Sequence, residues 1–361
     1  MSLNLSTPNT STTPNQPGHW VVTEFGTPSV LKWESWDPVS ELSAEKVLVR
    51  IIVAGIAGVD NIQRAGGYPY YNINPGFTPG YDFVGEVIAL GESVPKESGL
   101  TIGDRVASLC ITGAHATHIV LPYMQLIRIE RTDDPVQVAP LPLNYMTAWG
   151  MLKHSGVHLP PGSSILIGSA SGGLGTAVAQ LVTAFDMNIK MIGTCSPSKF
   201  GYLKSLGVEP VDRNAPNLVE QVRALTNGEG VDVAYDGVCS EDSLQKSLSA
   251  TKLDVGRVVV FAVMSEIATD GSGMQRSVED TLKSRLQPRM TFYGFDSHRS
   301  WLAELYAIVE KVRIRKLAPA IAKLLRLSEA VEAHEHLISG SAVKGKMLFI
   351  VDADLAAQHG I

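Results

Sequence analysis

The chain has 361 residues, of which 45% are hydrophobic, and its formal net charge is −6 at pH 7. This length predicts about two domains, and the hydrophobic content is sufficient for a core in each. The acidic balance without a basic cluster excludes a typical nucleic-acid-binding protein, and no apolar run approaches the roughly 18 residues of a membrane-spanning helix.

Residues 1–18 are rich in Ser, Thr, Pro and Asn, a composition typical of a disordered tail. They lack the basic start and apolar centre of a secretion signal and the arginines of a transit peptide. The chain has three cysteines, too few for a disulfide framework, which favours a reducing compartment. We therefore expect a cytoplasmic protein.

Between residues 19 and 143 the sequence alternates short apolar runs with turns that contain Gly and Pro. The runs are KVLVRIIVAGI, YDFVGEVIAL, DRVASLCI and THIVL. Their length and spacing predict a twisted, β-rich domain.

The most informative segment spans residues 165–194. An apolar run (ILI) leads into the turn Ala170-Ser171-Gly172-Gly173-Leu174-Gly175, a stretch with helical periodicity and a second apolar run, 189–193. This order is that of a dinucleotide-binding βαβ unit, with Ala170 in place of the first glycine of G-x-G-x-x-G. Gly172 would let the backbone approach a diphosphate, Gly175 would allow close helix packing, and the helix N-terminus would face the phosphates. The alternative is a purely structural glycine turn.

The residues after this second run distinguish NAD from NADPH. An NAD site usually has Asp or Glu about 20 residues beyond the glycines, where the carboxylate binds the ribose 2′-hydroxyl. Here no acid occurs, and Ser196, Lys199 and, further on, Arg213 offer a hydroxyl and cations that suit the 2′-phosphate of NADPH. The alternative is that Ser196 caps the next helix and Lys199 is solvated. The sequence favours NADPH.

From 144 to 296 strand candidates alternate with helical stretches, which predicts a doubly wound parallel α/β sheet. The strand candidates are ILIGS, IKMIGT, VEPVD, VDVAYDGV, GRVVVFAV and RMTFYGF. The block after residue 297 is expected to be mostly helical and to end in a strand, KGKMLFIV, that returns to the first domain. The predicted division is therefore a β-rich domain of residues 19–143, completed by 297–361, and a cofactor domain of 144–296.

Several motifs in order resemble the medium-chain dehydrogenase/reductase family, in its zinc-independent quinone oxidoreductase (zeta-crystallin-like) branch. They are AGIAGVDNIQRAGGYP, TPGYDFVGEVIALGE with GDRV, LNYMTAWGML, SASGGLG, GVDVAYDGV and AVKGKMLFIV. The resemblance implies a GroES-like catalytic domain and a Rossmann NADPH-binding domain. CSPSKF and VDRNAPNLVEQVR also resemble fungal trans-acting enoyl reductases that serve polyketide synthases.

The zinc members of this superfamily use cysteine and histidine ligands, and here Gly55-Ile56-Ala57 and Gly80-Tyr81-Asp82 stand at the ligand motifs. We expect no metal site, because the three cysteines are widely spaced. His115 and His118 should diverge on a strand, and His334 and His336 should lie on different faces of a helix as surface groups.

Without a metal, the expected reaction is hydride addition to an activated C=C bond or a quinone, with the proton coming from a tyrosine, a histidine or water. Asp60 is a pocket candidate, or a cap of the following helix. Tyr68, Tyr70 and Tyr71 lie on one loop and could contact substrate. Quinone reductases often carry Asn where this chain has Ala57, which places small-quinone reduction in doubt.

The resemblance places Thr147 beside the nicotinamide, although it could instead be a helix N-cap; Asn144 and Tyr145 precede it. Tyr145 is a possible proton donor, with aromatic core packing as the alternative. Ala262, Val263 and Met264 would offer backbone groups to the carboxamide. By resemblance Lys346 would reach the cofactor from the catalytic domain; the alternative is a solvated lysine.

The expected function is an NADPH-dependent reductase of α,β-unsaturated carbonyls or quinones, in secondary metabolism or as a trans-acting enoyl reductase on carrier-bound polyketides. The alternative of another class is a weakly catalytic nucleotide-binding protein. The strand RMTFYGF should lie at the edge of the cofactor sheet. Relatives pair this edge across a two-fold axis, so we expect a homodimer centred on residues 289–295, with a covered edge in a monomer as the alternative.

Overall fold

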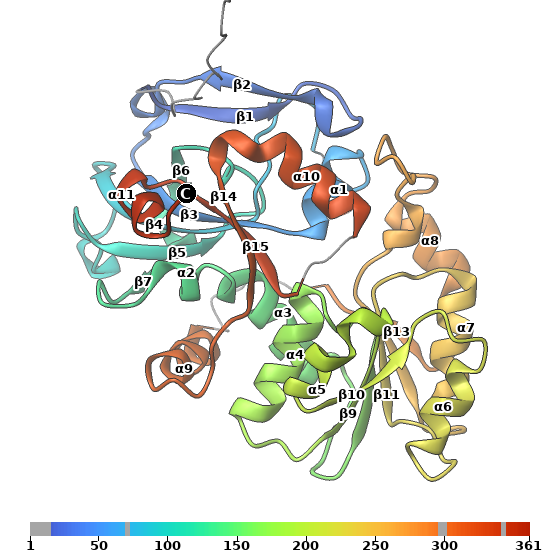
Figure 1. Cartoon of the computed structure of the whole chain (residues 1–361). Helices are drawn as coiled ribbons and strands as arrows, with labels where there is room; N and C mark the ends of the chain where they lie inside the picture. The colour runs from blue at the N-terminus through green and yellow to red at the C-terminus, as the bar shows by residue number, and fades with distance from the viewer. Residues whose placement is uncertain (1–15, 69–72, 295–301, 341–343) are drawn as a thin grey trace, which may run out of the picture.

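The computed structural model describes residues 16–68, 73–294, 302–340 and 344–361. Two large sheets lie one above the other in Figure 1, and the chain crosses between them more than once. None of the helices in these described ranges is both long and apolar enough to cross a membrane.

The lower sheet contains six parallel strands in the order β10-β9-β8-β11-β12-β13. All six strands expected from the sequence are present, and the predicted doubly wound sheet is confirmed. Their bounds are β8 Ser164–Ile167, β9 Lys190–Cys195, β10 Val208–Asp212, β11 Val233–Asp236, β12 Arg257–Val260 and β13 Met290–Phe292. The order reverses between β8 and β11, the place where open α/β sheets bind their ligands.

Helices surround this sheet because each carries an apolar side that the sheet buries. They are α3 Met146–Lys153, α4 Gly173–Ala184, α5 Phe200–Ser205, α6 Leu218–Ala224, α7 Glu241–Ala250 and α8 Val278–Arg285. Helix α4 directly follows the glycine-rich turn, as the sequence predicts, and packs against α3. The edge position predicted for RMTFYGF is also confirmed, because among the described strands β13, Met290–Phe292, pairs with β12 alone.

The upper sheet is built around the long strand β3 and has the order β14-β15-β3-β4-β5-β7, with β6 also paired to β3. Its bounds are β3 Lys46–Ile56, β4 Asp82–Leu90, β5 Arg105–Leu109, β6 His118–Pro122, β7 Ile127–Ile129, β14 Ile321–Arg326 and β15 Lys346–Ile350. A separate hairpin pairs β1 Gly18–Val22 with β2 Leu31–Ser35. The β-rich region predicted for this part of the chain is therefore present.

The last part of the chain completes the upper sheet. Strand β15 pairs antiparallel with β3, so the expected return of the closing strand is confirmed. Residues 321–326 were expected to be helical, and this expectation is wrong, since they form β14 parallel to β15. Their Leu, Ala and Lys residues favour a helix locally, but pairing with β15 and burial of Leu325 outweigh that preference.

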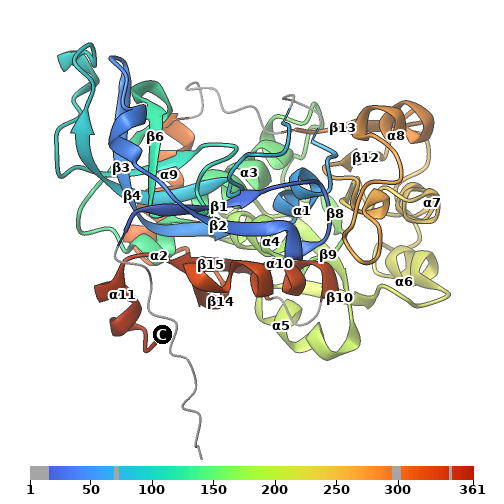
Figure 2. The ribbon, with the colours of Figure 1, turned by 90° about the horizontal axis from the view of Figure 1, so that it is seen from above.

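The remaining helices connect and cover the upper sheet. They are α1 Gly58–Arg64, α2 Pro135–Val138, α9 Leu302–Arg313, α10 Ala330–Ser339 and α11 Ala353–Gln358. Figure 2, seen from above, shows α10 and α11 along one side together with β14 and β15. One hydrophobic core includes residues of both sheets, such as Val84 in β4 and Ile165 in β8. This continuous packing fixes the relative position of the two sheets and of the cavity between them.

Candidate functional site

A cavity of about 460 Å³ lies between the two sheets. Its floor comes from the segments that follow β8, β9 and β12, including the glycine-rich turn. Its upper wall comes from the start of α1, from Tyr81 before β4 and from β15. The cavity therefore lies where the carboxyl ends of the parallel strands face the β-rich sheet.

The glycine-rich turn forms one wall of the cavity. Ser171 to Gly175 all line it, and Gly172 is the N-cap of α4. A Cβ at Gly175 would lie 2.6 Å from Cα of Ala170, so this glycine lets the helix start pack on the turn itself. Ala170 is buried and does not line the cavity. The turn thus presents the N-terminus of a twelve-residue helix, with its partial positive charge, to the cavity.

Cations gather at the end of the cavity beyond β9. Lys199 and Arg213 line it, whereas Ser196 does not; its hydroxyl lies 3.2 Å from that of Ser198. Burial lowers the pKa of Lys199, and the charges of Arg213 and Lys344 lower it further. Lys344, whose Nζ lies 5.7 Å from the centre of the Tyr202 ring, was missed by sequence reasoning. The one sequence feature that could have indicated Lys344 is its position as a basic residue just before the closing strand.

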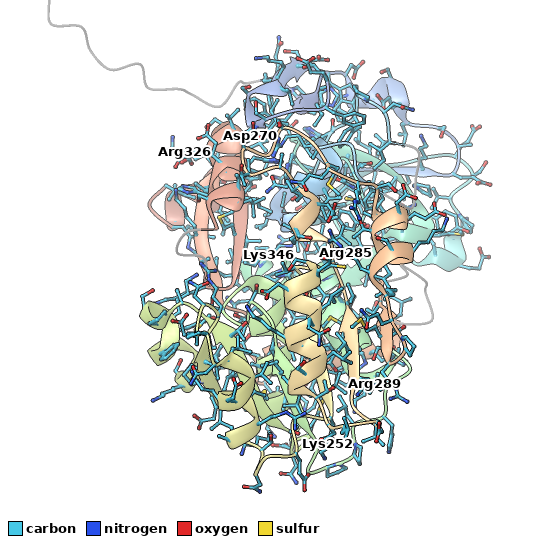
Figure 3. The ribbon with its side chains drawn as sticks, turned by 90° about the vertical axis from the view of Figure 1, so that its right-hand side faces the viewer. Lys252, Asp270, Arg285, Arg289, Arg326 and Lys346 are labelled. Carbon is cyan, nitrogen blue, oxygen red and sulfur yellow. The ribbon has the colours of Figure 1, made fainter. Side chains whose placement is uncertain are left out.

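The segment after β12 forms another wall. Phe261, Ala262, Val263 and Met264 all line the cavity there. The backbone N–H of Met264 donates to the carbonyl of Gly237 at 3.2 Å, which holds the segment against the end of β11. Arg285 secures the same segment through an ion pair of 2.5 Å with the buried Glu266. Figure 3 shows Arg285 at the level of the junction between the sheets.

The two residues expected beside the nicotinamide have different surroundings. Thr147 is inside α3 and is not its N-cap, so that alternative is wrong. Its Oγ1 is buried and has no hydrogen-bond partner among the described residues, and the residue lines the cavity. Tyr145 does not line the cavity; it lies in the core, its hydroxyl donates to Gln180, and burial raises its pKa. The geometry favours its packing role over proton donation.

Lys346 forms a buried ion pair at the cavity wall. Its ammonium lies 2.9 and 3.0 Å from the two carboxylate oxygens of Asp82 and 3.2 Å from Oδ1 of Asn144. Lys346 is 3% exposed, so the alternative of a solvated lysine is wrong. Because an ammonium has three hydrogens, these contacts use all of its donors. Figure 3 shows Lys346 between the two sheets.

Asp60 is fully buried and does not line the cavity. Its Oδ2 accepts the backbone N–H of Ala57 at 2.8 Å, which is the capping role that the sequence left open for it. The methyl group of Ala57 lines the cavity close by. Position 57 therefore contributes no hydrogen-bonding side chain to the site.

Tyr68 does line the cavity, and its hydroxyl contacts that of Tyr81, which lines it as well. The two rings meet edge to face, with centroids 6.0 Å apart. Tyr70 and Tyr71 lie outside the described residues. Sequence reasoning missed Tyr81, although an aromatic residue between Gly80 and Asp82, where zinc members have histidine, was a signal.

Of the two helix histidines expected to be surface groups, one is buried. His334 is fully buried and not a surface group, because α10 packs against α1. His336 is partly exposed and lies 3.1 Å from Glu332. Within the described ranges no three His, Cys, Asp or Glu side chains are placed to hold a metal ion, and the absence of a metal remains a prediction.

Two family models match the chain. The alcohol dehydrogenase GroES-like domain matches residues 43–131, and the zinc-binding dehydrogenase model matches residues 173–306. Quinone oxidoreductase from Homo sapiens is 27% identical over 337 residues, which cover 91% of this chain and 96% of that protein. The structure of Pseudomonas syringae pv. Tomato DC3000 quinone oxidoreductase superposes with a TM-score of 0.77 at 25% identity, over 93% of this chain and 100% of that one. Escherichia coli quinone oxidoreductase complexed with NADPH superposes with a TM-score of 0.78 at 21% identity, over 92% and 100% of the two chains.

Proposed function

Because the chain belongs to the medium-chain dehydrogenase/reductase family, in its quinone oxidoreductase branch, we propose that it is an NADPH-dependent reductase. Its substrate is the C=C bond of an α,β-unsaturated carbonyl compound, or a quinone. One observation carries the proposal: a single cavity joins a helix N-terminus, a cationic end and a pair of tyrosine hydroxyls.

The residues of this cavity fit the parts of NADPH. The glycine-rich turn and the start of α4 suit the diphosphate, since backbone N–H groups and the helix dipole face it. Lys199 and Arg213, with Lys344 nearby, suit the 2′-phosphate. The backbone around Val263 and the hydroxyl of Thr147 are polar groups available to the nicotinamide amide and ribose. Escherichia coli quinone oxidoreductase, which shares this fold, forms a complex with NADPH, and this supports NADPH as the cofactor.

The substrate end combines apolar walls with few polar groups. Ile56, Leu143 and Phe261 line it and would exclude water from the reacting carbon. NADPH, when bound, supplies the hydride. Because one of the Tyr68 and Tyr81 hydroxyls donates to the other, the hydrogen of the accepting hydroxyl can hold the carbonyl oxygen and stabilise the negative charge that develops on it. One of these Oη atoms can then return the proton to the substrate.

A substrate screen tests the proposal. Oxidation of NADPH would be followed by absorbance with enones, small quinones and enoyl thioesters tethered to a carrier protein. Turnover of enones or quinones supports a reductase of free substrates. Turnover of the tethered thioesters alone identifies a trans-acting enoyl reductase. NADPH binding without turnover of any acceptor would leave the weakly catalytic nucleotide-binding protein as the correct class.

A further inference from the structure

The amide of Asn144 has a fixed orientation at the wall of the cavity. We propose that its Nδ2 binds the nicotinamide-side phosphate of the cofactor and that the ion pair of Asp82 with Lys346 positions it. The inference rests on the proposed function, because it concerns how that site holds NADPH. Asn144 would then contact the cofactor, whereas Lys346, which the family resemblance places at the cofactor, would act through it.

The orientation of the amide follows from the chemistry of its neighbour. An ammonium group only donates hydrogen bonds, so the Asn144 atom 3.2 Å from Nζ of Lys346 must be the carbonyl oxygen. The NH₂ group therefore points the opposite way. Asn144 is 7% exposed and lines the cavity, and no described residue accepts a hydrogen bond from its Nδ2. The two Nδ2 hydrogens are therefore available to an acceptor on a ligand bound in the cavity.

The direction of Nδ2 is toward the start of α4. A Cβ at Gly173, the first residue of that helix, would overlap Nδ2 of Asn144, so glycine at this position leaves room for the amide. The neighbouring Gly172 forms a bridge with Gly345, which directly precedes Lys346. Three segments distant in sequence thus meet at the helix N-terminus, where an anion is favoured.

The choice of phosphate follows from the neighbours of Asn144 along the cavity. Thr147, three residues later in the helical segment, is on the same side and also lines the cavity. Lys199 and Arg213 mark the opposite, adenosine end. Asn144 therefore faces the part of the cavity that lies between Thr147 and the start of α4. In the proposed binding mode, this part holds the nicotinamide-side phosphate of the diphosphate.

The ion pair of Asp82 with Lys346 can hold the uncharged amide of Asn144 in place. Asp82 takes two of the three ammonium hydrogens of Lys346 and balances its charge, while the third hydrogen holds Oδ1 of Asn144. The burial of all three side chains limits their freedom to reorient. Asp82 begins β4 and Lys346 begins β15, so the upper sheet orients a residue that faces the turn of the lower sheet.

The test compares two ligands on the purified full chain. Asn144→Leu keeps the shape of the side chain and removes its donors. Dissociation constants would be measured by fluorescence titration for NADPH and for adenosine 2′,5′-bisphosphate, which lacks the nicotinamide-side phosphate. We expect NADPH binding to weaken at least tenfold and binding of the bisphosphate to change less than twofold. Gln245→Leu, an exposed amide on α7, serves as the control.

A double-mutant cycle tests the positioning role. Lys346→Met should weaken NADPH binding in the wild-type background and have no further effect in the Asn144→Leu background. Unchanged NADPH affinity in Asn144→Leu, or an equal loss for both ligands, would overturn the inference while leaving the proposed function intact. Failure of the wild-type chain to bind NADPH would instead overturn the proposed function and the inference together.

Discussion

The guanidinium Nε of Arg64 lies 3.2 Å from Nδ1 of His334, and both side chains are fully buried. Because Nε can only donate, His334 accepts on Nδ1 and is neutral, with its proton on Nε2. Arg64 also donates to the carbonyl of Gly271 at 3.1 Å, in the segment that follows β12. The pair therefore connects α1 and α10 of the upper region with a loop that follows a strand of the lower sheet.

This arrangement makes stability depend on pH. Burial and the nearby charges of His115 and Arg64 hold the pKa of His334 well below its ordinary value of 6.5. The unfolded chain then binds more protons below pH 6.5, so the contribution of this histidine to the free energy of unfolding should fall as the pH drops below 6.5. Denaturant unfolding at several pH values measures this.

His334→Gln keeps an acceptor for Arg64 and should remove this part of the pH dependence. The exposed His359→Gln is the matched control and should retain it. An identical pH dependence in His334→Gln and the wild type would contradict the interpretation.

NADPH should bind at least tenfold more tightly than NADH, a difference of about 1.4 kcal/mol. The reason is the cationic end of the cavity formed by Lys199 and Arg213, with Lys344 close by. Lys199→Ala and Lys344→Ala should each weaken NADPH binding and leave NADH binding unchanged, as measured by titration calorimetry. Ser196→Ala should change neither, because Ser196 does not line the cavity. Equal dissociation constants for the two cofactors in the wild type would refute the assignment.

Gly175→Ala should destabilise the protein by about 1–3 kcal/mol, because its Cβ would lie 2.6 Å from Cα of Ala170 in a packed turn. It should also weaken NADPH binding. Gly201→Ala is the matched control: a Cβ there meets nothing within 4 Å, so a gain of up to about 1 kcal/mol in helix α5 is expected. Thermal unfolding of both variants measures the effect, and an unchanged melting temperature in Gly175→Ala would contradict the packing argument.

Tyr68→Phe and Tyr81→Phe should each lower kcat, on the order of 100-fold if the missing hydroxyl returns the proton. The rings and the apolar wall remain, so the dissociation constant of NADPH should not change. Steady-state kinetics with the best acceptor from the substrate screen provide the readout, and the exposed Tyr306→Phe on α9 is the control. Full kcat in both variants would show that the proton comes from another group.

The edge strand β13 should join two chains into a homodimer, because an unpaired parallel edge is a surface that proteins cover or pair. Sedimentation at micromolar concentration should show about twice the 38.7 kDa of the single chain. A monomer would indicate that the edge is covered within the chain, and would favour the carrier-bound substrate.

Local patterns predicted most of the fold. The run KVLVRIIVAGI is β3 from its first residue to its last, and the glycine-rich turn leads into α4 as expected. These elements were predictable because period and turn chemistry are properties of neighbouring residues. The exception, β14, has helix-favouring residues and becomes a strand only through pairing with β15.

The site was less predictable, because its contacts join distant residues. Lys346 and Asp82 are 264 positions apart, and no spacing rule connects them. Both residues lie in motifs that resemble the family, but the motifs did not indicate that the two side chains form an ion pair. The burial of His334 depends in the same way on the packing of α10 against α1.

The pairing of β15 with β3 has a consequence for the order in which the protein folds during synthesis. Every strand of the lower sheet lies between residues 164 and 292, so that sheet can assemble while the ribosome is still adding the last part of the chain. Strand β3 can pair with β4 and β6 early, but residues 53–56 of β3 must wait for residues 346–350 before they can pair with β15. Lys346 arrives with that partner. A nascent chain thus acquires the glycine-rich turn well before it gains the ion pair of Asp82 with Lys346 at the cavity wall.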